Sequence, residues 1–318
     1  MSRLLRAVLL LLCAALAIAA GCRRQKEAAP PPLPEALREY QGREPRLRVY
    51  LHESGTIAEM DFEDYIAGVV AAEMDPQWPE SALGAQAIIA RTFTLQKIKE
   101  SGGLPERNAH ASTDFKEFQA YSAERINDRV RQAVEKTRGM VALYNGDYIK
   151  AWFHAYAGPR TALPDEGLDY EGGNPPYIQI VDSPAEKIIP EEEKNWSASF
   201  PLAQVQAAVR GVTGEDPGPV QNAEISEKGP SGRATKIKIN DVDVSAPSLR
   251  LALGSTEMRS TFIEEIELGE GGLYLAGTGY GHGVGMCQWG ARALAEEGRS
   301  PEEIVNYFYR DITLAKAW

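Results

Sequence analysis

The chain has 318 residues, enough for one large domain or two lobes, and 43% are hydrophobic, so a packed core is expected rather than disorder. The net charge of −11, from 34 basic and 45 acidic side chains, argues against nucleic-acid binding, which requires clustered lysine and arginine. Three cysteines without a Cys-x-x-Cys pair indicate neither a disulfide framework nor a zinc site.

The N-terminal residues are typical of an export signal. Arg3 and Arg6 form a positive region at the start of an apolar run over residues 4–20, which is short and rich in alanine, so a cleaved signal peptide is expected rather than a permanent membrane span. The run ends in Ala-Ala-Gly-Cys at Cys22, which resembles a bacterial lipoprotein box with alanine in place of the usual first leucine. We expect a lipoprotein-type signal peptide over residues 1–21, a lipid on Cys22 and an extracytoplasmic, membrane-anchored protein of the cell envelope; the alternative is an ordinary cleaved signal.

Residues 22–46 are charged, rich in proline and without apolar periodicity, so they predict a flexible tether. The elements predicted after it, in chain order, are a strand over 47–52, helices over 62–73, 79–100 and 125–138, a hairpin around Asn145-Gly146, a helix near 201–210, strands near 234–239, 261–267 and 273–276, and helices near 286–297 and 301–309. Because helices and strands mix without a regular βαβ alternation, the fold class is α+β, with one domain over 47–318.

One carboxylate is predicted on the buried face of its helix. The apolar positions of the helix over 62–73 form a stripe: Phe62, Tyr65, Ile66, Val69 and Val70. Glu73 lies seven residues after Ile66 and continues that stripe. Burial disfavours the charged form of a carboxyl group and raises its pKa, as a general acid near neutral pH requires. The alternatives are a helix end that points to water, or an ion pair with an arginine.

Arg91 lies in a segment that is apolar nearly all round, over residues 82–93, so this part of the helix is predicted to be buried on most sides. A guanidinium group in such a place needs a hydrogen-bonding partner. Three roles remain open: Arg91 supports Glu73, it pairs with another carboxylate, or it binds a substrate oxygen.

His154 is predicted on the outgoing strand of the hairpin. By alternation it shares a face with Lys150, Trp152 and Tyr156. Aromatic rings beside a polar side chain are typical of sugar-binding surfaces, because they offer flat apolar faces with hydrogen-bonding tips. The alternative is an amphipathic strand whose aromatic side chains pack in the core.

His282 lies among five alternating glycines between residues 277 and 285, and glycines permit close approach of the backbone to a ligand. We expect His282, together with Gln288, to line a cleft.

Cys287 offers a different class of function, because a cysteine beside a histidine could form the catalytic pair of a thiol peptidase. A buried, small structural side chain is the preferred interpretation of Cys287.

Four segments in this order resemble motifs of a known family: VVAAEMDPQWPESALGAQAIIARTFTLQ, STDFKEFQAY, AWFHAYAGPRT and GYGHGVGMCQWGARALAEEGRSPEEIVNYFY. Over about residues 47–318 the chain resembles the stage II sporulation protein D family, which also includes amidase enhancers. The positions that depart from the family motifs are Asp75, Ala157, Pro159, Cys287 and Trp289.

The resemblance implies a lytic transglycosylase that acts on peptidoglycan strands stripped of their stem peptides, with the essential glutamate of the family at Glu73. It would break the MurNAc–GlcNAc β-1,4 bond and leave a 1,6-anhydro end, in a glycan-binding cleft between two lobes, during cell-wall remodelling or sporulation. The candidate substrate-binding residues are Arg91, His154, His282 and Gln288. We expect no cofactor and no metal; the expected partners are glycan strands, the membrane and a cell-wall amidase. The alternative function is non-catalytic enhancement of an N-acetylmuramoyl-L-alanine amidase.

Overall fold

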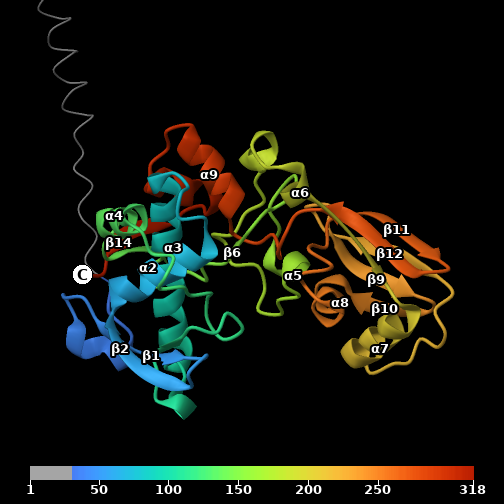
Figure 1. Ribbon diagram of the computed structural model, residues 1–318, viewed down its shortest axis with the longest axis horizontal. Helices are drawn as coiled ribbons and strands as arrows, with labels where there is room; N and C mark the ends of the chain where they lie inside the picture. The colour runs from blue at the N-terminus through green and yellow to red at the C-terminus, as the bar shows by residue number, and fades with distance from the viewer. Residues whose placement is uncertain (1–30) are drawn as a thin grey trace, which may run out of the picture. The chain divides into compact units, whose positions relative to one another are not determined.

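The computed structural model describes residues 31–318 (Figure 1), and the fold class is α+β, as predicted. The strands form several small sheets of two or three strands rather than one large sheet. The expected signal peptide and Cys22 lie outside the described residues. Within residues 31–318, no helix combines the length and the apolar character that a membrane crossing requires.

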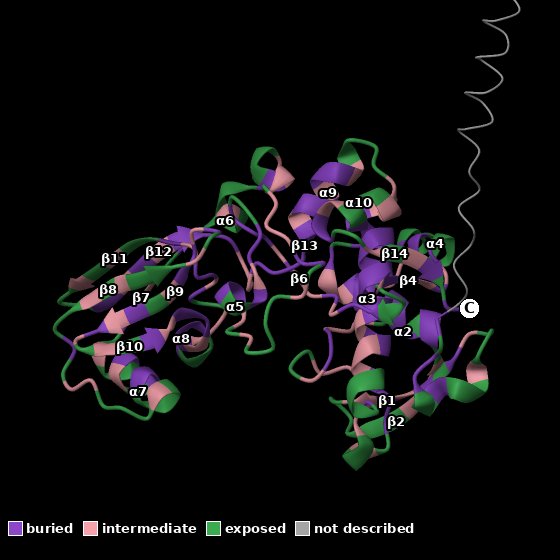
Figure 2. Cartoon of the chain, turned by 180° about the vertical axis from the view of Figure 1, so that it is seen from behind, coloured by how far each residue is buried: buried purple, intermediate pink, exposed green. Residues whose placement is uncertain are grey.

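Buried side chains form two separate hydrophobic cores, which Figure 2 shows as two sets of buried residues. The first core draws on residues 33–189 and 284–317, and the second draws on residues 196–275. The chain therefore leaves the first core, builds the second core and returns. The single domain predicted over 47–318 contains an inserted module with a core of its own.

The longest helix is at the centre of the first core. Helix α3 (Glu80–Ser101) is buried over most of its length because four other helices pack around it (Figure 1). These helices are α2 (Phe62–Glu73), α4 (Asp128–Lys136), α9 (Gln288–Glu296) and α10 (Pro301–Phe308).

Three small sheets complete the first core. Strand β1 (Arg46–Leu51) pairs antiparallel with β2 (Thr56–Asp61) and parallel with β3 (Ala111–Ser112). Strand β4 (Met140–Tyr144) lies between β5 (Asp147–Tyr148) and β14 (Thr313–Lys316). Strand β6 (Phe153–His154) pairs parallel with β13 (Met286–Cys287). The remaining short elements are η1 (Glu35–Tyr40), η2 (Pro105–Arg107), α5 (Pro164–Gly167), η3 (Pro184–Lys187) and α6 (Glu191–Lys194).

The second core lies between two antiparallel sheets and two helices. One sheet has the order β10-β9-β8 and the other the order β11-β12-β7. Their bounds are β7 (Asn195–Phe200), β8 (Ala223–Lys228), β9 (Ala234–Ile239), β10 (Val242–Ser245), β11 (Ile263–Gly269) and β12 (Gly272–Thr278). The helices are α7 (Leu202–Thr213) and α8 (Ala246–Leu253), which pack against each other and each contact a sheet.

Most predicted elements are present, and the exceptions have local causes. Helix α2 and strand β9 have the predicted bounds, while Pro79 precedes the first turn of α3 instead of opening it. The hairpin turn is confirmed, with positive φ at Asn145 and Gly146. Its outgoing strand ends at Tyr148. The Lys150 N–H donates to the Tyr177 hydroxyl at 2.8 Å instead of to the neighbouring strand.

The predicted common face of His154, Lys150, Trp152 and Tyr156 is therefore wrong. Residues 153–154 form β6, which pairs with β13 and belongs to a different sheet from β5. Alternation along one strand does not carry across the break at residues 149–152, so the four side chains have different environments: His154 and Tyr156 are buried, whereas Lys150 and Trp152 are partly exposed.

The described part of the predicted tether, residues 31–46, packs against the first core instead of being free of contacts. Leu33 and Leu37 are buried in that core. The Leu33 N–H donates to the Gln41 side chain at 2.9 Å, and η1 occupies residues 35–40. The proline-rich composition suggested a tether, but the segment also contains two leucines whose side chains are buried in the first core.

A buried ion pair joins the helices of the first core. The Arg91 guanidinium is fully buried and donates to both carboxylate oxygens of Glu63, at 3.2 and 2.7 Å, and to the Met140 carbonyl at 2.8 Å. Glu63 also accepts from the Gly139 N–H at 2.9 Å and from the Trp318 indole at 3.1 Å. This carboxylate therefore joins α2, α3, the start of β4 and residue 318.

Removal of Arg91 should destabilise the protein strongly, because it leaves the Glu63 carboxylate buried without its cation. We expect Arg91→Met to lower the free energy of unfolding by about 3–5 kcal/mol, measured by urea denaturation. The control is Lys99→Met, which removes a cation from the exposed Lys99–Asp147 pair on the same helix and should cost less than about 1 kcal/mol. Equal losses in the two variants would contradict a structural role for the buried pair.

Candidate active site

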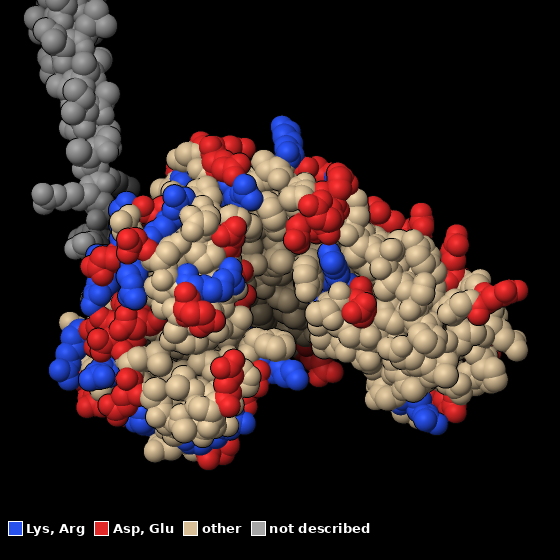
Figure 3. Space-filling model, viewed as in Figure 1, with Lys and Arg blue, Asp and Glu red and all other residues tan. Residues whose placement is uncertain are grey.

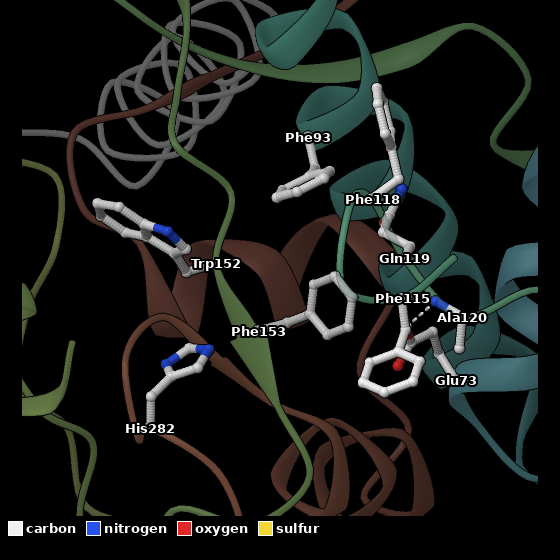
Figure 4. A pocket seen from close by; sticks show the side chains of 9 residues that line it. All are labelled: Glu73, Phe93, Phe115, Phe118, Gln119, Ala120, Trp152, Phe153 and His282. Carbon is white, nitrogen blue, oxygen red and sulfur yellow. Dashed lines mark hydrogen bonds between the residues drawn. The ribbon is translucent and has the colours of Figure 1, made fainter. Parts of the chain in front are cut away.

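A pocket of about 360 Å³ opens on the first core, and Figure 4 shows its lining. Its walls are mostly aromatic, with a few polar groups. The lining residues are Glu73, Phe93, Phe115, Phe118, Gln119, Ala120, Trp152, Phe153 and His282. They come from the end of α2, from α3, from the loop after β3, from the segment that enters β6 and from the glycine-rich loop before β13. Segments far apart in the sequence thus build one site.

Glu73 is the last residue of α2 and is partly buried at the pocket wall. One of its carboxylate oxygens accepts the Ala120 N–H at 2.8 Å, drawn as a dashed line in Figure 4. Burial raises the pKa of Glu73 to about 7, against smaller lowering effects of the hydrogen bonds from Ala120 and from the Gln288 side chain. A substantial fraction of Glu73 is therefore protonated at neutral pH, and the group can donate a proton.

The loop after β3 is held in place by α2. The Ser122 N–H donates to the Gly68 carbonyl at 3.0 Å, and the Tyr121 ring stacks on Tyr65 with centroids 5.9 Å apart. A Cβ atom at Gly68 would come within 2.1 Å of the Tyr121 ring, so only glycine permits this approach. The helix that ends at Glu73 thereby also fixes the loop that supplies the Ala120 N–H.

Three glutamines lie around Glu73, two of them not anticipated from the sequence. Gln288, predicted as a site residue, is buried at the start of α9, and its amide lies 3.5 Å from the Gln86 side-chain oxygen. Gln119 donates to the Thr94 hydroxyl at 3.0 Å. Among the described residues, Gln86 Nε2 and Gln119 Oε1 are buried without a hydrogen-bond partner. A polar side chain in an otherwise apolar helix was the signal that could have singled out Gln86.

His154 and His282, two of the predicted site residues, lie side by side, with ring centroids 5.5 Å apart. His282 lines the pocket, and its Nδ1 accepts the Val284 N–H at 3.0 Å. His154 is buried outside the pocket lining, with Nδ1 3.1 Å from the Val284 carbonyl and Nε2 without a partner in residues 31–318. Burial lowers both pKa values, that of His282 to about 3, so the two rings are neutral at pH 7. Gly281 permits this packing, since a Cβ there would lie 2.8 Å from His154 Cβ.

Arg91 and Cys287 lie away from the pocket lining. The Arg91 guanidinium has no exposed surface and is bound to Glu63, which is the second of the three roles that the sequence left open. Cys287 is buried before α9, where its sulfur accepts the N–H groups of Ala157 and Gly290 at 3.3 Å. Burial raises the pKa of the Cys287 thiol, which disfavours the thiolate that a peptidase requires.

Neither the pocket nor the rest of residues 31–318 contains a group of three or more His, Cys, Asp or Glu side chains that could hold a metal ion. The polar groups at the described site are those of the pocket lining and its neighbours. The chief group is one carboxyl of raised pKa, beside neutral amides, neutral imidazoles and aromatic rings.

Comparisons with known proteins agree with the motifs. A family model described as stage II sporulation protein matches residues 50–144, and one described as a domain of unknown function (DUF8618) matches residues 190–285. The first match contains Glu73 and the loop that binds it. The second spans the inserted core and the loop of His282.

Three relatives extend these matches over most of the chain. An uncharacterised protein of Brachyspira hyodysenteriae is 31% identical over 264 residues, which cover 81% of this chain and 67% of that protein. Stage II sporulation protein D of Bacillus subtilis is 28% identical over 85% of this chain and 78% of its own length. The amidase enhancer of the same organism is 26% identical over 78% of this chain and 40% of its own length. This chain belongs to the stage II sporulation protein D family.

Proposed function

We propose that this protein is a lytic transglycosylase that cleaves the MurNAc–GlcNAc β-1,4 bond of peptidoglycan strands. The observation that carries the proposal is Glu73, a partly buried carboxyl group in an aromatic pocket, whose pKa is raised to about 7. Among the pocket-lining residues within 31–318 it is the one carboxylic acid. Hydrolysis of a glycosidic bond ordinarily uses two carboxyl groups, whereas a reaction with an internal nucleophile requires one.

The reaction proceeds in two proton transfers through the same group. Protonated Glu73 donates its proton to the glycosidic oxygen as the bond from C1 of MurNAc to that oxygen breaks. The Glu73 carboxylate then accepts the proton of the MurNAc 6-hydroxyl as that oxygen bonds to C1 and closes the 1,6-anhydro ring. No water is consumed, and Glu73 ends in its starting protonated form.

The rest of the pocket suits a sugar polymer. The faces of Phe93, Phe115 and Trp152 offer flat apolar surfaces, and Phe115 is 69% exposed, so it is free to stack on a pyranose ring. Gln119 lines the pocket, and its buried Oε1 has no hydrogen-bond partner among the described residues. Figure 3 shows acidic and basic side chains interspersed over one face of the molecule.

The second candidate function is non-catalytic enhancement of an N-acetylmuramoyl-L-alanine amidase. The similarity to a protein named amidase enhancer favours it, and so does the inserted module, whose core contributes no residue to the pocket around Glu73. Under this function the aromatic pocket binds glycan and presents it to the amidase without cleaving it.

The replacement of Glu73 distinguishes the two functions. We expect Glu73→Gln to lower the rate of release of 1,6-anhydro-ended fragments from stripped glycan strands by about a thousandfold, because it removes the transferable proton. The measurement is mass spectrometry of the products. The control is Asp75→Asn, which neutralises an exposed carboxylate two residues away that accepts only the local Gln77 N–H; its rate should be unchanged.

Two outcomes would decide against catalysis at Glu73. Wild-type protein that yields no cleavage but accelerates an amidase would support the enhancer function. Cleavage retained in Glu73→Gln but lost in Cys287→Ala would support a reaction at the thiol.

The pH dependence of the reaction should follow the ionisation of Glu73. Because the acid acts in its protonated form and the pKa is raised to about 7, kcat/KM should be flat below pH 7 and fall about tenfold per pH unit above it. The profile is measured between pH 5 and 9 with folding monitored by circular dichroism. A profile that rises through pH 7 would mean that the ionised form is the active one.

We also propose that Cys22 carries the lipid that anchors the protein to the membrane outside the cytoplasm. The support is the Ala-Ala-Gly-Cys sequence after an apolar run. Mass spectrometry of the mature protein should find an N-terminal cysteine with two or three acyl chains, and Cys22→Ala should release the protein from the membrane fraction. An unmodified N-terminus at another residue would contradict the anchor.

A further inference from the structure

A second pocket, of about 280 Å³, adjoins the first along helix α3. The two pockets share Phe93 and Trp152, which Figure 4 shows at one side of the first. Five residues of the second pocket are spaced as one face of α3, and two come from the segment between β5 and β6. They are Phe93, Gln96, Lys97, Glu100 and Ser101, with Lys150 and Trp152. A polymer bound at Glu73 would therefore continue into this pocket.

The second pocket has a net positive charge, since two ammonium groups face one carboxylate. That carboxylate, Glu100, is already engaged: Lys150 Nζ donates to its two oxygens at 3.0 and 3.1 Å, and the Gln96 amide donates at 2.9 Å. These bonds lower the pKa of Glu100, so it remains ionised and paired. The second cation, Lys97, is left for other partners.

Lys97 has no carboxylate within 4.0 Å among residues 31–318. Its ammonium group donates to the Glu117 backbone carbonyl and lies 4.6 Å from the Phe118 ring centroid and 5.9 Å from that of Phe93. The Glu117 side chain is itself paired with Arg107 at 2.5 Å. Burial lowers the pKa of Lys97, and the carboxylates of Glu117 and Glu100 offset this lowering only in part. An ammonium group has three donors, so Lys97 retains hydrogen bonds for a ligand.

We propose that Lys97 binds a carboxylate of the glycan strand in the second pocket, beside the bond that Glu73 cleaves. This inference rests on the proposed function. Peptidoglycan offers such a carboxylate from two sources: the free lactyl group of a muramic acid without its stem peptide, and the acidic groups of a stem peptide. Lys97 is then a specificity-determining residue, because a neutral glycan has no partner for its ammonium group.

The contact should be measurable as a difference in affinity. A charge-assisted hydrogen bond in a partly buried site is stronger than one between neutral groups. We expect acidic strands to bind about tenfold more tightly than the same strands with neutralised carboxyl groups, a free-energy difference of about 1.4 kcal/mol.

The experiment measures binding in the Glu73→Gln background, so that no strand is consumed. Isothermal titration calorimetry compares stripped glycan strands, the same strands with amidated carboxyl groups, and strands that retain stem peptides. The variant is Lys97→Met, which keeps the length of the side chain. The matched control is Lys99→Met on the same helix, whose cation is exposed, pairs with Asp147 and does not line either pocket.

The expected result is a tenfold preference for carboxylate-bearing strands that disappears in Lys97→Met and persists in Lys99→Met. A preference for stripped strands identifies the lactyl carboxylate, and one confined to peptide-bearing strands identifies the peptide. The inference is overturned if stripped and amidated strands bind equally and peptide-bearing strands bind no more tightly, or if both variants lose the preference. Cleavage by wild type would then leave the proposed function standing. Absence of binding to every strand overturns both.

Discussion

The architecture of the site depends on the buried contact between Arg91 and Glu63. A guanidinium and a carboxylate that leave water together are tolerated only when their remaining hydrogen-bonding groups are also satisfied, and here the Gly139 N–H, the Met140 carbonyl and the Trp318 indole complete the set. The contact fixes α2 against α3. Because α2 ends in the candidate acid and α3 contributes a wall to both pockets, a shift between these helices would change the site directly.

Glu73 shows how a fold maintains a carboxyl group near its neutral form. Its position at the end of α2 places it by the negative end of the helix dipole, which disfavours a carboxylate, and the aromatic walls keep water away. One backbone N–H from Ala120 and one amide from Gln288 orient it without fully stabilising the charge. The surrounding imidazoles are neutral, so they add no positive charge that would lower the pKa again.

Structural features that produce a local periodicity in the sequence could be predicted. Features that depend on contacts between residues far apart in the sequence could not. The stripe of α2 predicted both the helix and the burial of Glu73, and the apolar surroundings of Arg91 predicted that it is buried, though not that its partner is Glu63. The two-residue strand at His154 has no periodic signal, and its partner strand begins at Met286, far away in the chain. The Ala120 N–H is a backbone group, and no residue type indicates it.

The insertion of one core inside the other has a consequence for the order of folding. Strand β14 pairs with β4, and α9 and α10 pack on α3, so the first core lacks these contacts until residues 284–318 have been made. Contacts between such distant segments form slowly, because a long loop must close before they yield any stabilisation. The helices α2, α3 and α4 can contact one another early, but the first core cannot be completed before the C-terminal segment has been made. Completion of the first core is therefore the last step of folding for which the whole chain is needed.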